Sequence, residues 1–425
     1  MSFYQELQWR GLVHDSIPGT DELLDKGSCN GYIGFDPTAS SLTVGNLVTV
    51  MMLVHFQRAG HTPIALVGGA TGMIGDPSGK DEERKLLDEE TLQSNVNSME
   101  TQLRKFLDFD CEKNPAELVN NLDFYKDMEL FSFFRDIGKH LTVSYMTSKD
   151  SVKSRLESGM SFTEFSYQLF QGYDFRELYQ KKNCVLQMGG SDQWGNITSG
   201  TELIRRMDGG KAYALTCPLL TKSDGSKFGK SEGGNIWLDP KRTSPYKFYQ
   251  FWLNSSDEDA VKYMRIFSTM KKEEIEALEK EHAEATYIRL LQKELAKEIT
   301  IRVHSEKDFN TAVTASELLF GKGTTEGLRN LTESTLLDIF SGVPQSKVNL
   351  SEINNGINII DFLSEKSNTL PSKGEARRTI KGGGISINKE KVGDDQRTID
   401  ASDLLNGKYI LVQKGKKNYH LVTAE

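Results

Sequence analysis

The sequence predicts an α/β fold with a doubly wound parallel sheet, followed by an α-helical domain and a small α+β domain. Two observations predict the sheet: β-like apolar runs such as residues 63–67 alternate with helical stretches, and the apolar run 32–35 ends at an acid. Helical periodicity and charge dominate residues 244–321. Near the carboxyl end a helical pattern, a glycine break and an alternating pattern over residues 374–388 predict the last domain.

The composition bounds the class of protein. The chain has 425 residues, 37% of them apolar, which suffices for two or three domains with separate cores. No stretch approaches the roughly 18 to 20 apolar residues that cross a bilayer, and the start lacks the features of a signal peptide, so we expect a cytoplasmic protein without a membrane contact. Four scattered cysteines favour reduced structural thiols and suggest no metal site.

A strand, a turn and a helix start are expected between residues 32 and 56. Pro37 breaks the apolar run, and small hydroxyl residues lead into an amphipathic stretch. Small residues at such a turn let a nucleotide approach the backbone, and the helix N-terminus offers free N–H groups to phosphate. An ordinary helix capped by Ser41 or Thr43 explains the same pattern.

A polar loop further along the chain carries the sequence Lys227-Phe228-Gly229-Lys230-Ser231, which we expect to be neither helix nor strand. Two lysines on a flexible loop can close on a polyphosphate as its charge develops. Solvated surface lysines are the alternative explanation.

One helix carries a polar stripe among aromatic residues. Tyr167, Gln171 and Asp174 lie at i, i+4 and i+7 and therefore share one face. This stripe favours a binding site, and a structural hydrogen-bond network explains it equally well.

Two glycine-rich segments differ in what they predict. Gly190 follows a β-like run and precedes Asp192, so the backbone can approach a nucleotide and the acid can accept from ribose hydroxyls, although such a turn alone is weak evidence. Residues 68–80 fail the spacing of a phosphate-binding loop, because Asp81 stands where Ser or Thr is required. We therefore reject an NTPase.

The charge distribution points to a nucleic-acid partner at the carboxyl end. The net charge is −8, but residues 371–420 hold eleven Lys and Arg against six Asp and Glu, a balance of +5 that leaves −13 on the remainder. A basic helix beside short strands is typical of a phosphate-backbone reader, and a solvated basic surface is the alternative.

Together these motifs resemble those of class I aminoacyl-tRNA synthetases. Residues 32–47 are similar to the "HIGH" region and KFGKS to the "KMSKS" loop, and the order of the other motifs resembles the bacterial tyrosyl type over essentially the whole chain. Residues 374–388 and 414–419 are similar to the small RNA-binding module named after ribosomal protein S-four.

The resemblance implies a domain plan and a reaction. Tyrosine would attack the α-phosphorus of ATP, giving tyrosyl-adenylate and pyrophosphate, and the terminal ribose of tRNA(Tyr) would then take the tyrosyl group. Magnesium would accompany ATP, and a homodimer would form through residues 108–145. The implied domains are a Rossmann-like catalytic domain at 1–222, a mobile lysine-loop region at 223–243, a helical anticodon-arm domain at 244–321, a linker at 322–354 and an RNA-binding domain at 355–425.

Site residues are carried over position by position from this resemblance. Tyrosine would be held at its ammonium group by Asp76, Tyr167 and Gln171, at its phenolic hydroxyl by Tyr32 and Asp174, and elsewhere by Gln187 and Gln193. ATP would lie against Gly34, Asp36, Gly45, Gly190, Asp192 and Lys230. The catalytic set is Thr38, Thr43, Asn46, Lys80, Arg84, Lys227 and Lys230, with the charged members opposing charge on the departing pyrophosphate.

The chain departs from the family signature where two histidines are usual, since it has Thr43 and Asn46 there. Both can donate hydrogen bonds, with a shorter reach than histidine.

The loss of the two histidines favours one alternative function, a catalytically silent RNA-binding protein, which the complete tyrosine pocket opposes. A tryptophan synthetase is opposed by Tyr32 with Asp174, and a purely metabolic nucleotide-binding enzyme by the basic C-terminal module.

Overall fold

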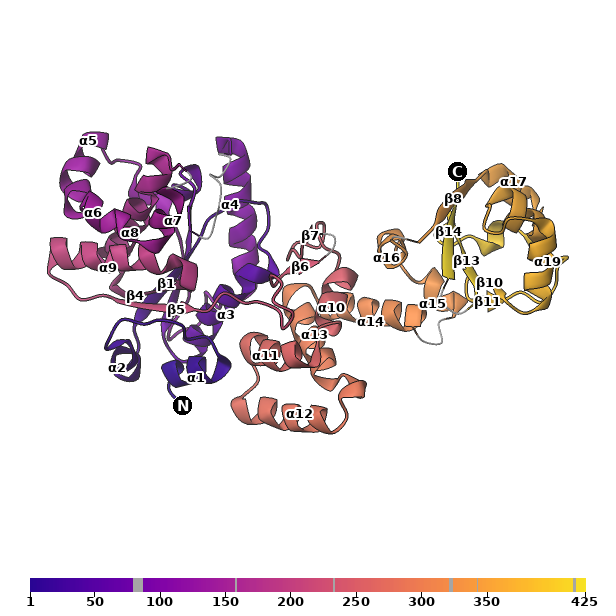
Figure 1. The fold of residues 1–425 in the computed structure, drawn as a ribbon, viewed down its shortest axis with the longest axis horizontal. Helices are drawn as coiled ribbons and strands as arrows, with labels where there is room; N and C mark the ends of the chain where they lie inside the picture. Colours follow the sequence, from indigo (N-terminus) through magenta and orange to yellow (C-terminus); the bar gives the residue numbers. More distant parts are fainter. Residues whose placement is uncertain (79–86, 157–158, 232–233, 321–323, 342, 416–417) are drawn as a thin grey trace. The chain divides into compact units, whose positions relative to one another are not determined.

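The computed structural model describes the chain except residues 79–86, 157–158, 232–233, 321–323, 342 and 416–417 (Figure 1). It contains two compact units. The first comprises Met1–Thr243 and Phe251–Val303, and the second comprises Ser244–Gln250 and His304–Glu425. Within the described ranges no helix combines the length and the apolar character needed to cross a membrane.

A five-stranded parallel sheet forms the centre of the first unit, in the order β3-β2-β1-β4-β5. Its strands are β1 (Asn30–Phe35), β2 (Thr62–Val67), β3 (Glu117–Asn120), β4 (Cys184–Gly190) and β5 (Tyr213–Cys217). In register, Tyr32 of β1 lies between Ile64 of β2 and Gln187 of β4. The strand order reverses between β1 and β4, so the crevice of this doubly wound fold opens at their carboxyl ends. The predicted fold class is confirmed.

Helices cover this sheet and carry the polar residues of the crevice. Helix α3 packs against β1 and β2, and α8 and α9 lie side by side against β4 (Figure 1). Helix α8 begins after Ser161, whose hydroxyl accepts the Glu164 N–H, and it ends at Asn183 in the left-handed conformation. The helices before β5 are α1 (Phe3–Arg10), α2 (Thr20–Asp25), α3 (Val44–Arg58), α4 (Glu89–Leu103), α5 (Leu130–Ser132), α6 (Val143–Thr147), α7 (Asp150–Leu156), α8 (Phe162–Lys182) and α9 (Trp194–Asp208), with short turns η1 (Thr71–Met73), η2 (Asn121–Phe124) and η5 (Ser191–Gln193).

Helices also follow the sheet, as the periodicity of residues 244–321 predicts. Strongly amphipathic α11 buries Tyr263, Met264 and Phe267. The helices of this region are α10 (Pro245–Leu253), α11 (Asp257–Phe267), α12 (Lys272–Glu284), α13 (Leu290–Val303) and α14 (Glu306–Phe320). Helices α11 to α13 belong to the compact unit of the parallel sheet, and α14 belongs to the second unit. The domain boundaries expected from the sequence stay a prediction.

The second unit is built on a mixed sheet in the order β11-β10-β13-β14-β8. Strand β8 pairs parallel with β14, and the other pairs are antiparallel. The predicted basic helix and the strand after it correspond to α19 and β10, which bury Ile380 and Ile385 in one core. The strands of this sheet are β8 (Gln345–Val348), β10 (Ile385–Ile387), β11 (Glu390–Lys391), β13 (Tyr409–Lys414) and β14 (Asn418–Ala424). A separate pair is formed by β9 (Ile357–Asn358) and β12 (Thr398–Ile399). The helices are α15 (Thr325–Arg329), α16 (Glu333–Ile339), α17 (Leu350–Asn355), α18 (Ile359–Asp361) and α19 (Lys373–Lys381).

Residues 322–354, which the sequence presents as a linker, contain regular structure. Helices α15 and α16, strand β8 and most of α17 lie within them. These elements have four to seven residues each, which is too short for a periodic pattern to be recognised.

Candidate active site

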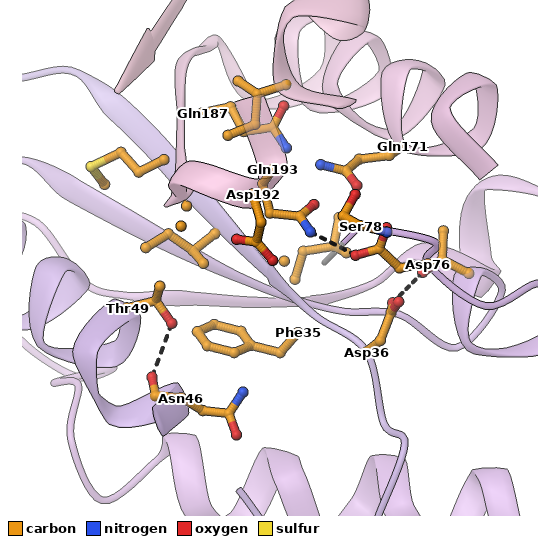
Figure 2. Close-up of a pocket in the computed structure, with 18 of the residues that line it drawn as sticks. Phe35, Asp36, Asn46, Thr49, Asp76, Ser78, Gln171, Gln187, Asp192 and Gln193 are labelled. Atoms are coloured by element: carbon orange, nitrogen blue, oxygen red, sulfur yellow. Dashed lines mark hydrogen bonds between the residues drawn. The ribbon is translucent and has the colours of Figure 1, made fainter. Parts of the chain in front are cut away.

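A pocket of about 330 Å³ lies at the carboxyl ends of β1 and β4 (Figure 2). Most of the predicted site residues line it, from β1, the turns after β1 and β2, helices α3 and α8, and the end of β4. These are Tyr32, Gly34, Asp36, Thr38, Gly45, Asn46, Asp76, Tyr167, Gln171, Asp174, Gln187, Gly190, Asp192 and Gln193.

One end of the pocket is a buried polar cluster around Asp174. Its carboxylate accepts a hydrogen bond of 2.9 Å from Asn121 Nδ2 and one of 2.7 Å from the Tyr125 hydroxyl. Burial raises the pKa of Asp174 to about 7, although both hydrogen bonds oppose that rise. The hydroxyl of Tyr32 is also buried, and among the described residues it has no hydrogen-bond partner. This end of the pocket therefore has an unpaired hydroxyl and a carboxylate ready for a polar ligand group.

The sequence did not single out Asn121 or Tyr125. Asn121 directly follows β3, which belongs to the same parallel sheet as β1. Since ligands bind at the carboxyl ends of such strands, this position could have been predicted from the sequence. Tyr125 lies just after η2 and carries no comparable signal.

A hydrogen-bonded chain runs from Asp174 to Asp36 at the end of β1. Asn121 Nδ2 also donates to Thr71 Oγ1 at 3.0 Å, and Thr71 Oγ1 donates to Asp36 Oδ1 at 2.7 Å. The other oxygen, Asp36 Oδ2, accepts from the Tyr167 hydroxyl at 2.7 Å. Both oxygens of Asp36 are thus held in place at the pocket wall, where the carboxylate can face a cation.

The Asp36–Thr71 contact depends on a glycine in the turn after β2. A Cβ atom on Gly68 would lie 2.2 Å from Asp36 Oδ1 and 2.4 Å from Thr71 Oγ1. No other residue fits there without separating the two side chains.

A second carboxylate, Asp76, is held by donors from its own turn, from η5 and from α9. Gln193 Nε2 donates to Asp76 Oδ2 at 2.6 Å (Figure 2). Asn196 Nδ2 and the Ser78 N–H both donate to Asp76 Oδ1. Oxygen Oε1 of Gln187 is buried and, in the part of the chain that is described, accepts no hydrogen bond. Two oriented carboxylates and an open amide oxygen suit the ammonium group of an amino acid.

The outer part of the pocket is formed by the start of α3 and the turn after β4. Gly45, Asn46 and Thr49 contribute from α3, and Gly190 and Asp192 contribute from the end of β4 and η5. Thr49 Oγ1 donates to the backbone oxygen of Asn46 at 2.9 Å (Figure 2). A helix N-terminus beside a glycine turn and an acid suits phosphate and ribose groups.

The predicted lysine loop leads into a short hairpin. Lys230 and Ser231 form the two-residue strand β6 (Lys230–Ser231), which pairs with β7 (Gly234–Asn235). The expectation of neither helix nor strand is therefore wrong for these two residues. Backbone hydrogen bonds between short segments leave no trace in sequence periodicity. The side chains of Lys227 and Lys230 are exposed and do not line the pocket.

The hairpin is nevertheless anchored close to the pocket. The ring of Phe228 is buried and stacks on Phe267 with the centroids 5.5 Å apart. Gly229 has a positive φ of 80°, and a Cβ there would lie 2.9 Å from Val44 Cγ2 at the start of α3.

Backbone hydrogen bonds join the segment after the hairpin to the segment before α3. The Val44 N–H donates to the Ile236 oxygen at 3.0 Å, and the Leu238 N–H donates to the Leu42 oxygen at 2.9 Å. Thr43 and Trp237 form an antiparallel bridge between these two contacts. The hairpin and the helix start are therefore one connected structure.

Three predicted residues remain to be placed. Thr43 precedes α3 but does not line the pocket. Lys80 and Arg84 lie outside the described residues. No group of three or more His, Cys, Asp or Glu side chains suited to a metal ion occurs among the residues that are described.

The fold is that of a doubly wound α/β protein, and the polar groups of its pocket suit a nucleotide and a small zwitterion with a polar end group. Residues 25–321 match the family model of class I tRNA synthetases for tryptophan and tyrosine, and residues 335–422 match the C-terminal domain of SYY-like tyrosine–tRNA ligases. The chain belongs to the class I tRNA synthetase family.

 Two tyrosine–tRNA ligases are similar to this chain over nearly its whole length. The tyrosine–tRNA ligase of Cytophaga hutchinsonii is 63% identical over 423 residues, covering 99% of each chain. That of Porphyromonas gingivalis is 61% identical over 430 residues, covering 100% of each chain. Among solved structures, a C-terminally truncated mitochondrial tyrosyl-tRNA synthetase of Aspergillus nidulans matches with a TM-score of 0.68 and 30% identity, covering 75% of this chain and 94% of that one.

Proposed function

We propose that the protein is a tyrosine–tRNA ligase, which activates tyrosine with ATP and transfers the tyrosyl group to the 3′-terminal ribose of tRNA(Tyr). The observation that carries the choice of tyrosine is the buried hydroxyl of Tyr32, unpartnered among the described residues, in the same pocket end as the Asp174 carboxylate. Phenylalanine would leave the Tyr32 hydroxyl unpaired and would offer no phenolic proton to Asp174, and an indole has no such proton either.

The residues of the pocket support a division of roles in the first step. Asp36, Asp76, Tyr167 and Gln171 would hold the ammonium group, so that the tyrosine carboxylate faces the α-phosphorus of ATP. The reaction needs positioning and charge stabilisation more than proton transfer. Lys227 and Lys230, on the hairpin next to α3, would oppose the charge of the leaving pyrophosphate, and we assign the same role to Lys80 and Arg84 by resemblance.

As a class I synthetase the protein uses ATP, and we propose that magnesium arrives bound to its phosphates. Gly34, Gly45, Gly190 and Asp192 would contact the nucleotide, with Thr38 near its γ-phosphate. The basic residues between 371 and 420 would bind tRNA. We expect the protein to act in the cytoplasm.

We also propose a homodimer in which a second copy covers an apolar face of the first unit. Large apolar side chains are exposed in and around the predicted region 108–145, and the rings of Phe134 and Phe162 lie with their centroids 6.5 Å apart. Exposed apolar side chains gathered in one segment are typical of an interface. The exposed residues are Leu130, Phe131, Phe134, Val143 and Phe162.

Tyrosine-dependent exchange of labelled pyrophosphate into ATP tests the proposed activity. We expect exchange with tyrosine and none above background with tryptophan or phenylalanine. Lys230→Ala should abolish most of it, because a cation opposing the leaving group is lost. Lys26→Ala, which removes an exposed lysine on the first unit outside the site, is the matched control.

A second measurement separates the enzyme from a silent RNA-binding protein. We expect labelled tyrosine to be transferred to tRNA(Tyr) in the same preparation. Binding of tRNA without exchange or transfer would contradict the proposed function.

A further inference from the structure

Thr43 and Asn46 occupy the two positions where the family signature usually has histidines, and they are bonded to each other. The Thr43 N–H and the Thr43 hydroxyl both lie within hydrogen-bond distance of Asn46 Oδ1, at 3.0 and 2.8 Å. A backbone N–H can only donate, so the side-chain atom that receives it must be the amide oxygen rather than the amide nitrogen. The orientation of the Asn46 amide is therefore fixed.

This orientation leaves the amide nitrogen of Asn46 available. Within the described residues Nδ2 makes no hydrogen bond to the protein, and Asn46 lines the pocket. Figure 2 shows the nitrogen on the side of Phe35 and the oxygen on the other side. Two N–H donors thus face the part of the pocket that we assign to ATP.

Thr43 itself is held away from the pocket. Its backbone forms a bridge with Trp237, and the next residue, Val44, donates its N–H to the Ile236 oxygen at 3.0 Å. Gly45 and Asn46 line the pocket, whereas Thr43 does not. Its hydroxyl is already committed to Asn46.

We propose that Thr43 is a positioning residue, which holds the Asn46 amide with its nitrogen toward ATP, and that Asn46 alone makes the contact. The two residues then act as one unit instead of two independent donors. This inference rests on the proposed ATP-dependent activation of tyrosine.

A double-mutant cycle tests this assignment through kcat and KM for ATP in pyrophosphate exchange. Asn46→Ala should lower kcat/KM for ATP by about 10- to 100-fold, the range for losing a hydrogen bond to a charged group. Thr43→Val should lower it by about three- to tenfold, since the amide loses one of its two tethers. Thr43→Val combined with Asn46→Ala should be no worse than Asn46→Ala alone, because Thr43 acts only through the amide.

Two further variants distinguish loss of the Asn46 N–H donor, and loss of the Thr43 hydroxyl that holds the amide, from effects on folding. Asn46→Asp keeps the oxygen that Thr43 binds but loses the donor, so it should impair use of ATP at least as much as Asn46→Ala. Thr43→Ser keeps the hydroxyl and should restore most of the activity lost in Thr43→Val. Thr101→Val, at an exposed threonine of α4, controls for the same chemical change elsewhere. The KM for tyrosine should not change in the Thr43 variants.

Two results would contradict the proposed roles of Thr43 and Asn46. Multiplicative losses in the double variant would show that Thr43 contacts ATP directly, and an Asn46→Asp protein with wild-type kinetics would show that the amide nitrogen is not a donor. Either result overturns the inference. A wild-type protein without tyrosine-dependent exchange would instead refute the proposed function, so the two failures are distinguishable.

Discussion

Asp174 combines a buried carboxyl group with two hydrogen-bond donors, Asn121 and Tyr125. Burial raises its pKa from the ordinary value of 3.8 to about 7. Because the folded protein binds this proton more tightly than the unfolded chain does, protonation of Asp174 stabilises the fold. The stabilisation is complete below the pKa of the unfolded chain and is lost as the pH rises through about 7. Tyrosine recognition should have the opposite dependence, because the ionised carboxylate is the stronger acceptor for the phenolic proton.

We therefore expect tyrosine affinity to fall several-fold as the pH is lowered from 8.5 to 6, through the raised pKa of Asp174. Titration calorimetry at several pH values measures this. Asp174→Asn should bind tyrosine more weakly and lose the pH dependence. A wild-type affinity that stays constant over this range would contradict the expectation.

The sequence identified most residues that line the pocket, because the family motifs name them one by one. It did not identify Thr71, which also lines the pocket, or Asn121 and Tyr125, which do not; all three donate hydrogen bonds to the predicted carboxylates Asp36 and Asp174. Such partners come from other strands and turns, and only the three-dimensional fold brings them within hydrogen-bond distance.

At the scale of elements, the turn after β2 brings Asp36 and Thr71 together across Gly68. Gly68→Ala would push the two side chains apart, with a cost of about 1 to 3 kcal/mol for overpacking. We expect lower unfolding free energy in urea and weaker tyrosine binding, since Asp36 would lose its fixed orientation.

Gly393→Ala is the matched control for this change, because a Cβ atom there meets no other atom within 4 Å. It should leave both the unfolding free energy and tyrosine binding near the wild-type values. Equal effects of the two substitutions would contradict the role of Gly68.

Elements with a strong periodic pattern were predictable, and short ones were not. The parallel strands and the helices of residues 244–321 follow from apolar runs and periodicity. The hairpin at Lys230 and the elements of residues 322–354 do not, because each has only two to seven residues, too few for a period to be recognised.

At the scale of the whole molecule, the proposed homodimer depends on apolar side chains that the single chain leaves in water. Phe131 is 83% exposed, more than any other phenylalanine among the exposed large apolar residues. A charge at an apolar interface costs free energy because it must be desolvated without a partner.

We expect Phe131→Asp to shift the protein from dimer to monomer in sedimentation equilibrium. Tyr287→Asp, which introduces the same charge at a side chain that is 85% exposed on a different segment, should leave the dimer intact. A wild-type protein that sediments as a monomer would rule out the proposed dimer.

The backbone pairing of Val44 and Leu42 with Ile236 and Leu238 has a consequence for protein engineering. Residues almost two hundred positions apart are paired by backbone hydrogen bonds. We therefore expect that the two segments similar to the family signatures cannot be exchanged separately. A chimera that takes residues 38–46 from a relative should work only when residues 229–239 come from the same relative. The turn before α3 and the lysine hairpin would then be transferred together, with their backbone pairing intact.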